Sequence, residues 1–299
     1  MMKALVHQRF LAQSVIPFRS FQSRRRIHFR FRAAPGDAEV PVEGEQCNIV
    51  AEALKRGKLG FGFSAGGLLF PYYLGIVNTL NELNVITDAT PLAGASAGSL
   101  IAACHHSGLP AQQVKDACFL LADDCRRKGT RGRLGTVLSE FLYDLLPQDA
   151  HERCNHKTFV AVTRAWPRPQ GELISEFHSR EDLIEALLTS CHIPWWFQGT
   201  IGRNFRGALH FDGGLTNFCP AVNAPGVLTQ RVTCFPAARL RRAINIAISP
   251  PEQYDLNVLL GWAFQPAEEA VLLAFLEQGS KDALAWAKSN GVGDGHVAQ

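Results

Sequence analysis

The chain has 299 residues, of which 46% are apolar, so it is long enough to bury a substantial hydrophobic core. Its formal net charge at pH 7 is only +3, which argues against a nucleic-acid-binding protein with a strongly basic surface. No stretch approaches the roughly 20 continuous apolar residues that span a bilayer, so we expect no transmembrane segment.

The first 36 residues differ in composition from the rest of the chain, because they carry eight basic side chains and no acidic one. Without them, 22 Lys and Arg remain against 27 Asp and Glu, which gives a formal net charge of −5. An Arg-rich leader without acidic residues is typical of an organellar transit peptide, and the alternative is a disordered basic tail that binds anionic surfaces. We predict a leader over residues 1–45 and an organellar location, with the chloroplast favoured over the mitochondrion.

Residues 46–299 are expected to form one catalytic domain, with a core over about residues 58–290. The eight cysteines are scattered and contain no C-x-x-C pair, which predicts reduced, buried thiols. His105 and His106 follow Cys104 directly, but adjacent residues on a helix point in different directions. We therefore predict neither a metal site nor an organic cofactor.

A glycine-rich turn follows the first predicted strand. Residues 59–63 alternate as a strand, and residues 71–83 have apolar side chains at helical spacing. The turn between them, residues 64–67, exposes backbone N–H groups at the positive end of a helix. Fixed donors of this kind hold the oxygen of a tetrahedral intermediate, so Gly66 and Gly67 are candidate oxyanion-hole residues. The alternatives are a phosphate-binding turn and a simple connection.

The sequence from Gly94 to Gly98 reads G-A-S-A-G and has the G-x-S-x-G pattern of a nucleophile elbow. Such an elbow holds a serine on a sharp turn between a strand and a helix, and its glycines allow the backbone to turn tightly. We expect a strand leading in over residues 87–92 and a helix over residues 99–104. Ser96 is therefore the candidate nucleophile.

The middle of the chain alternates between predicted helices and strands. Helices are predicted over residues 110–124 and 135–146, and the basic segment 126–133 lies between them. This segment is either a loop that binds anionic lipid head groups or a set of charges at a helix C-terminus. Two strands joined by a proline-rich turn are predicted over residues 159–163 and 173–177.

A variant of the capping box at residues 179–182 predicts a helix that ends near Ser190. Consecutive aromatic residues follow at Trp195, Trp196 and Phe197. Such side chains line an acyl pocket, sit at a lipid interface or pack in a core. We expect core packing for at least one of the two tryptophans.

A second sharp turn is predicted after residues 209–211, a short strand that ends at Asp212 and is followed by Gly213 and Gly214. A carboxylate at the end of a strand, beside an elbow serine, lies where an α/β sheet gathers its chemistry. The alternative is the ordinary role of Asp-Gly as a turn. Together with the elbow, the position favours catalysis.

The order of the candidate residues argues against a conventional triad. An α/β-hydrolase places its residues in the order Ser, Asp or Glu, and His, but the only histidine after Asp212 is His296, near the end of the chain. His192 and His210 are more simply packed, hydrogen-bonded histidines. We therefore predict a Ser96–Asp212 dyad, in which the carboxylate takes the serine proton directly.

Near the C-terminus, residues 244–248 are predicted to form a last core strand. Pro266 and the acidic residues after it start a long amphipathic helix that Gly279 divides. This helix is expected to pack on the sheet, and the alternative is that it lies on a membrane. The order of strand, glycine turn, helix, strand, elbow and helix predicts a three-layer α/β/α sandwich with a mostly parallel central sheet.

These motifs together resemble a patatin-like phospholipase domain, in particular the adipose-triglyceride-lipase and adiponutrin-type branch. The matching blocks are Gly62 to Gly67, Gly94 to Gly98, Ser190 to Pro194, and Asp212 to Asn217. One block departs from the family. Aligned on G-x-G-x-x-G, its first and last glycines are Ala65 and Phe70, and Leu68 or Leu69 replaces a basic residue that some members carry.

The resemblance implies a serine esterase of the triacylglycerol lipase or phospholipase A type. Its substrates would be fatty-acyl esters of acylglycerols, phospholipids or galactolipids, reached at a membrane or lipid-droplet surface. Two alternatives remain. One is a soluble thioesterase or esterase with the same elbow, and the other is a catalytically weak or inactive lipid-binding adaptor, which the altered glycine block supports.

Overall fold

The computed structural model describes residues 43–240 and 244–292, with side chains from residue 49 onward. The first helix, α2 (Glu43–Lys55), begins before the end of the predicted leader at residue 45, so the predicted boundary falls within this helix. Residues 1–42 of the predicted leader, and His296, lie outside the described residues.

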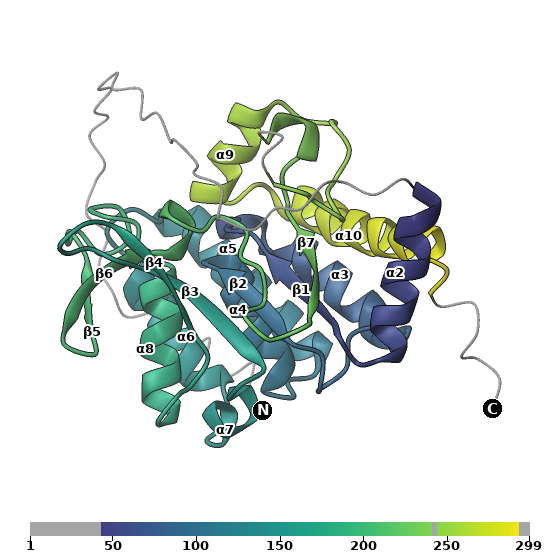
Figure 1. Ribbon diagram of the computed structural model, residues 1–299. Coiled ribbons are helices and arrows are strands. Elements are labelled where there is room, and N and C mark those ends of the chain that lie inside the picture. Colours follow the sequence, from purple (N-terminus) through teal and green to yellow (C-terminus); the bar gives the residue numbers. More distant parts are fainter. Residues whose placement is uncertain (1–42, 241–243, 293–299) are drawn as a thin grey trace. The chain divides into compact units, whose positions relative to one another are not determined.

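Seven strands of the described region form one mixed sheet in the order β5-β6-β3-β2-β1-β7, with β4 paired to β3 (Figure 1). The strands β7, β1, β2 and β3 are parallel, and β4, β5 and β6 pair antiparallel. The strands are β1 (Leu59–Phe63), β2 (Leu92–Ala95), β3 (Thr158–Arg164), β4 (Gln170–Ile174), β5 (Arg203–Phe205), β6 (Ala208–Asp212) and β7 (Leu228–Val232). This mostly parallel sheet with helices around it has the predicted α/β class.

The helices pack around the sheet in two main hydrophobic clusters. The larger cluster joins β1 to α3 (Phe70–Glu82), α4 (Ala97–His106) and α10 (Glu269–Ser289). The second joins β3 to α6 (Leu134–Leu145) and α8 (Arg180–Ser190). The helices α5 (Ala111–Lys128), α7 (Ala150–Cys154) and α9 (Leu256–Phe264) complete the set used below.

Helices α3 and α10 approach each other so closely that the contact requires glycine. A Cβ atom at Gly279 would lie 2.1 Å from the carbonyl oxygen of Tyr72, and one at Gly75 would lie 2.0 Å from that of Leu276. The prediction that Gly279 divides the last helix was therefore wrong, because α10 runs unbroken through this residue. The helix packs on α3, and Trp286 near its end also reaches the sheet residue Phe61.

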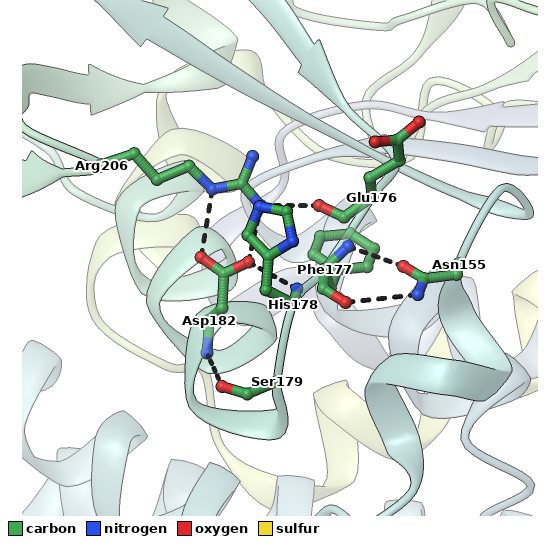
Figure 2. A network of polar contacts seen from close by, with 7 residues as sticks. All are labelled: Asn155, Glu176, Phe177, His178, Ser179, Asp182 and Arg206. Carbon is green, nitrogen blue, oxygen red and sulfur yellow. Dashed lines mark hydrogen bonds and ion pairs between the residues drawn. The ribbon is translucent and has the colours of Figure 1, made fainter.

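A polar network fixes the start of α8 to the hairpin between β5 and β6 (Figure 2). The Ser179 hydroxyl accepts the N–H of Asp182 at 3.2 Å, which is the predicted cap. The Asp182 carboxylate accepts from Arg206, at 2.6 Å and 3.1 Å, and Arg206 lies in the hairpin turn with φ +48°. Beside them, the Asn155 side chain exchanges two hydrogen bonds with the backbone of Phe177. The bonds from Arg206 anchor the hairpin whose second strand, β6, ends at Asp212.

Two predicted boundaries shift for local reasons. Residues 87–91 are not a strand, because the Thr90 hydroxyl accepts the Thr87 N–H at 2.9 Å and closes a turn before β2 begins at Leu92. The basic segment 126–133 is not all loop. Its first three residues form the last turn of α5, where positive charge is favourable.

The predicted strands at 173–177 and 244–248 also differ from the structure. The first lies earlier, as β4, and the second is reduced to one parallel bridge between Val232 and Ile248. The edge position beside β1 belongs instead to β7, which the sequence did not predict. Parallel pairing joins segments far apart in the chain, so local patterning does not reveal which one occupies an edge.

Within the described residues, no single helix is long and apolar enough to cross a membrane. Helices α9 and α10 reach that length and composition only as a pair, with a bend of 111° between them.

Candidate active site

The glycine turn, the elbow and Asp212 meet at one end of the sheet because of strand register. Phe63, the last residue of β1, pairs with Gly94 in β2. On the other side of β2, Ala95 pairs with Ala161 of β3, and the next residue of β3 pairs with Asp212. The glycine turn and the elbow, about thirty residues apart in the sequence, therefore converge with Asp212, which follows more than a hundred residues later, where parallel strands end.

Ser96 lies between β2 and α4 in a strained conformation, with φ +51° and ψ −120°. The flanking glycines allow this turn. A Cβ atom at Gly94 would lie 2.1 Å from the backbone of Gly98, and one at Gly98 would lie 2.2 Å from the carbonyl oxygen of Phe63. Larger residues do not fit, so the G-x-S-x-G spacing has a steric origin here.

A second serine holds the elbow in place. The Ser190 hydroxyl accepts the backbone N–H of Ser96 at 2.9 Å and donates to the carbonyl oxygen of Ala161 at 2.7 Å. All three residues are buried. Ser190 thus ties the elbow to β3, and it uses the backbone of Ser96 rather than its hydroxyl. The sequence placed Ser190 in a family block but gave no signal of this contact.

Asp212 is fixed by its own backbone and by the turn that follows it. Its N–H donates to the carbonyl oxygen of His192 at 2.8 Å, and its Oδ1 accepts the Gly214 N–H at 2.7 Å. A Cβ atom at Gly213 would lie 2.0 Å from the carbonyl oxygen of Ala161, so the chain passes close to β3. The carboxylate is held in a single orientation.

The side chain of Ser96 lies close enough to the Asp212 carboxylate to influence its ionisation. Burial raises the pKa of Asp212 from its ordinary value of 3.8 to about 7, against the opposing effects of the Gly214 hydrogen bond and the Ser96 hydroxyl. The carboxylate is only 4% exposed, so desolvation of its charge is the dominant cause. The arrangement is a serine hydroxyl beside a carboxylate whose basicity matches neutral pH.

The two candidate oxyanion residues lie at the start of a helical segment. Gly67 begins a short 3-10 helix that leads into α3, and its φ of +54° favours glycine. A Cβ atom at Gly66 would lie 2.6 Å from the sulfur of Cys234, and one at Gly67 would lie 2.1 Å from the carbonyl oxygen of Ala263. The first N–H groups of a helix have no carbonyl partner within that helix, so they are available to an anion.

Buried hydroxyl groups on the core side of this turn form a hydrogen-bond network. The Ser64 and Tyr73 hydroxyl oxygens lie 2.7 Å apart, and Ser64 also donates to Thr233 at 3.1 Å. The Tyr73 oxygen accepts the N–H of Cys234 at 3.2 Å. Tyr73 and Cys234 are the same residues that crowd the Cβ position of Gly66. The network fixes the turn from the side that packs into the core.

An apolar cavity extends from Ser96 and Gly67. It encloses about 900 Å³ when the open space at its mouth is counted, and its walls come mainly from α4, α5 and α6. The lining side chains include Leu100, Val114, Leu121, Leu138, Leu142 and Phe197. A cavity of this character accepts an apolar chain beside the serine.

The two histidines near the site bond to other groups. His192 is buried, which lowers the pKa of its ring, and the ring contacts the carbonyl and hydroxyl oxygens of Thr200 at 3.3 Å. The ring of His210 lies within hydrogen-bond distance of the Ala208 carbonyl oxygen and of Glu172. Both have the packed, hydrogen-bonded role expected from the sequence.

The tryptophans divide between surface and cavity. Trp195 is 61% exposed, whereas Trp196 is half-buried and lines the cavity. Cys191 also lines the cavity, and its burial raises the pKa of its thiol. The sequence indicated that this aromatic segment has a structural or binding role, but not which of its side chains are exposed and which line the cavity.

Comparison with known proteins finds similarity to one family. A family model described as patatin-like phospholipase matches residues 63–225. Human patatin-like phospholipase domain-containing protein 4 is 33% identical over 222 residues, which cover 69% of this chain and 81% of that protein. Mouse 1-acylglycerol-3-phosphate O-acyltransferase Pnpla3 is 28% identical over 258 residues, which cover 78% of this chain. This match covers 60% of the mouse protein, and the match to the human protein of the same name covers 36% of that protein.

Among solved structures, VipD from Legionella pneumophila is similar with a TM-score of 0.46 and 14% identity, over 78% of this chain and 67% of that one. The sequence matches confirm the resemblance drawn from the motifs, including its adiponutrin-type branch. Because the family model covers more than half of the chain, the protein belongs to the patatin-like phospholipase family.

Proposed function

We propose that this protein is a lipid acyl hydrolase in which Ser96 is the nucleophile and Asp212 the general base. The observation that carries the proposal is the position of the strained elbow serine beside a buried carboxylate whose pKa is raised to about 7. Family membership supports esterase chemistry on lipids.

The first half of the reaction forms an acyl-enzyme. Asp212 takes the proton of the Ser96 hydroxyl as the serine oxygen attacks the ester carbonyl. The amides of Gly66 and Gly67 donate to the negative oxygen of the tetrahedral intermediate. When the intermediate collapses, the bond to the alcohol oxygen breaks, and the alcohol leaves with the proton held by Asp212.

In the second half, Asp212 removes a proton from water, which attacks the acyl carbonyl. Collapse of this second intermediate returns the proton to Ser96 and releases the fatty acid. No other base is required, because a carboxylate with a pKa of about 7 is half ionised at neutral pH and accepts a proton far more readily than an ordinary aspartate.

The apolar cavity favours a long acyl chain over a small or polar acid. Its walls are aliphatic and aromatic, and Ser96 lies in its lining. We propose acylglycerols, phospholipids or galactolipids as substrates. Transfer of the acyl group to an alcohol instead of water uses the same intermediate, and the acyltransferase name of the mouse relative makes this the second candidate.

The test is fatty-acid release by the full chain from emulsified triacylglycerol, phosphatidylcholine and monogalactosyldiacylglycerol, with a lysophospholipid as alternative acyl acceptor. We expect release that Ser96→Ala abolishes and that Asp212→Asn lowers by about 10²–10⁴-fold. Ser139→Ala, on α6 outside the site, is the matched control and retains activity. Equal background release by wild type and Ser96→Ala on every lipid, with normal lipid binding, would support the adaptor role instead.

We also propose that residues 1–45 direct the protein to an organelle, with the chloroplast favoured, and that residues 46–299 form the catalytic domain. The composition of the leader supports this. A fusion of residues 1–45 to a fluorescent protein, expressed in plant cells, should accumulate in plastids. Accumulation in mitochondria would correct the organelle, and a cytosolic fusion would refute the leader.

A further inference from the structure

Helix α9 is an apolar helix with much of its apolar surface exposed. Its nine residues, LNVLLGWAF, contain one polar side chain, and Leu259 is its one buried residue. Val258 is 42% exposed and Leu260 is 38% exposed. A helix that is apolar all round normally lies in a core or in lipid, so this exposure requires an explanation.

Helix α9 is also held firmly against the candidate active site. Ala263 lines the cavity together with Ser96, and its carbonyl oxygen occupies the space beside Gly67. The Thr130 hydroxyl donates to the carbonyl oxygen of Phe264 at 2.8 Å. The exposed side chains are therefore presented from a fixed position next to the cavity, not from a loose segment.

The aromatic and basic residues around this end of α9 fit a lipid surface. The Phe264 ring packs edge-on against Trp196, with ring centroids 5.0 Å apart, and the neighbouring Trp195 is 61% exposed. The Trp196 carbonyl oxygen accepts the N–H of Gly132 at 2.6 Å, which brings the basic segment 126–133 alongside. Tryptophan is the side chain most suited to the boundary between acyl chains and head groups.

The basic segment 126–133 supplies the positive charge. It contains five Arg and Lys residues, of which Arg127, Lys128 and Arg131 are exposed. Four of the five form ion pairs with Asp123 or Asp124, the aspartates of α5 that precede the segment, and Arg131 is the cation that the docking uses. Two acidic residues, Glu268 and Glu269, are exposed at the start of α10, so the charge around α9 is mixed. Apolar contact should therefore provide most of the binding, and the cations should add a preference for anionic lipid.

We propose that the exposed face of α9, with Trp195 and Arg131, docks the protein onto a phospholipid bilayer that contains anionic lipid. Val258 and Leu260 project from the two flanks of the exposed side of α9, on either side of the buried Leu259, with Asn257 and Gly261 between them. They enter the boundary with the acyl chains as the helix lies along the surface, and Arg131 contacts head groups. The docking does not depend on the proposed chemistry. Its role in bringing acyl esters to the cavity does rest on the proposed function.

The test compares full-chain variants in a sedimentation assay with phosphatidylcholine vesicles, with and without phosphatidylglycerol. The double variant Val258→Asp and Leu260→Asp should lower the partition coefficient at least about tenfold on both vesicles, because two apolar contacts are lost and two charges added. Leu284→Asp, at a 51% exposed position of α10, is the matched control and should change it less than about twofold. Arg131→Gln should lower it about fivefold, and only with anionic lipid.

Three further measurements separate the possible outcomes. Hydrolysis of a soluble short-chain ester should be unchanged in the α9 variants, which shows that they fold, and it tests the proposed function separately. Ser96→Ala should bind vesicles like wild type. If the double variant binds vesicles as well as wild type does, the proposal is refuted. If that variant instead abolishes a concentration-dependent dimer of the wild type, α9 is an interface between two copies.

Discussion

The raised pKa of Asp212 predicts how activity depends on pH. In the proposed mechanism only the ionised carboxylate takes the Ser96 proton, so kcat/KM should rise with pH and level off above a pKa of about 7. At pH 5, about 1% of such a carboxylate is ionised, which predicts kcat/KM about a hundredfold below its plateau. An aspartate with its ordinary value of 3.8 would be more than about nine-tenths ionised at that pH and would cause almost no loss.

The assay is the hydrolysis of a soluble short-chain ester from pH 4.5 to pH 9, because a soluble substrate removes the pH dependence of lipid binding. The logarithm of kcat/KM should fall with unit slope below about pH 7. A profile that stays flat down to pH 5 would contradict the argument that burial sets the basicity of Asp212. A matching inflection in the residual activity of Asp212→Asn would assign the ionisation to another group.

The same shift has a consequence for stability. In the folded state Asp212 holds its proton up to about pH 7, whereas in the unfolded chain it loses the proton near its ordinary pKa of 3.8. Asp212 therefore adds most to the free energy of unfolding below pH 3.8, and this contribution falls as the pH rises from 3.8 to about 7. Above pH 7, Asp212→Asn should raise the melting temperature, since it removes a buried charge and keeps an acceptor for Gly214. The difference between variant and wild type should vanish at low pH.

Three further predictions concern the supporting structure. Ser190→Ala should lower kcat more than it raises KM, and it should lower the free energy of unfolding by about 1–3 kcal/mol, because the Ser96 N–H loses its partner. Ser190→Thr should restore both kcat and stability. Gly67→Ala should lower kcat at least about tenfold, because Gly67 has a φ of +54° and a Cβ atom there would lie 2.1 Å from a backbone carbonyl oxygen of α9. An unchanged kcat would exclude this turn from the oxyanion hole. Gly279→Ala should lower the free energy of unfolding in urea by about 1–3 kcal/mol, whereas Gly261→Ala, with open space around it, should not; equal effects would refute the close-packing argument.

The sequence predicted best those features that have a local cause. The turn around Ser96 requires glycine on both sides, because the backbone leaves no room for a Cβ atom there, and this requirement is visible as a motif. Strand β1 alternates clearly, and Ser179 caps α8 as the pattern predicts. The α/β class followed from the order of these elements and is that of the family.

Features with a distant cause were not predictable in the same way. Ile244 to Ile248 reads as a strand, but β7 takes the edge position beside β1 because pairing is decided across more than a hundred residues. Helix α9 has no apolar and polar faces to give it a helical period, although Asp255 caps its start. The contact of Ser190 with the elbow is a single hydrogen bond between segments about ninety residues apart, and no local pattern encodes it.

The atoms around the altered glycine block show which of its positions require glycine. Gly67, the motif glycine that remains, and Gly66 beside it are positions where a Cβ atom would meet a carbonyl oxygen or a sulfur at less than 3 Å. The two replaced ones differ, because Ala65 is half-buried with its methyl group beside Gly214, and Phe70 belongs to the wall of the cavity. Side chains at these two positions fill space, while the backbone that would donate to an oxyanion keeps its glycines. The altered block therefore leaves in place the backbone that the proposed hydrolase requires.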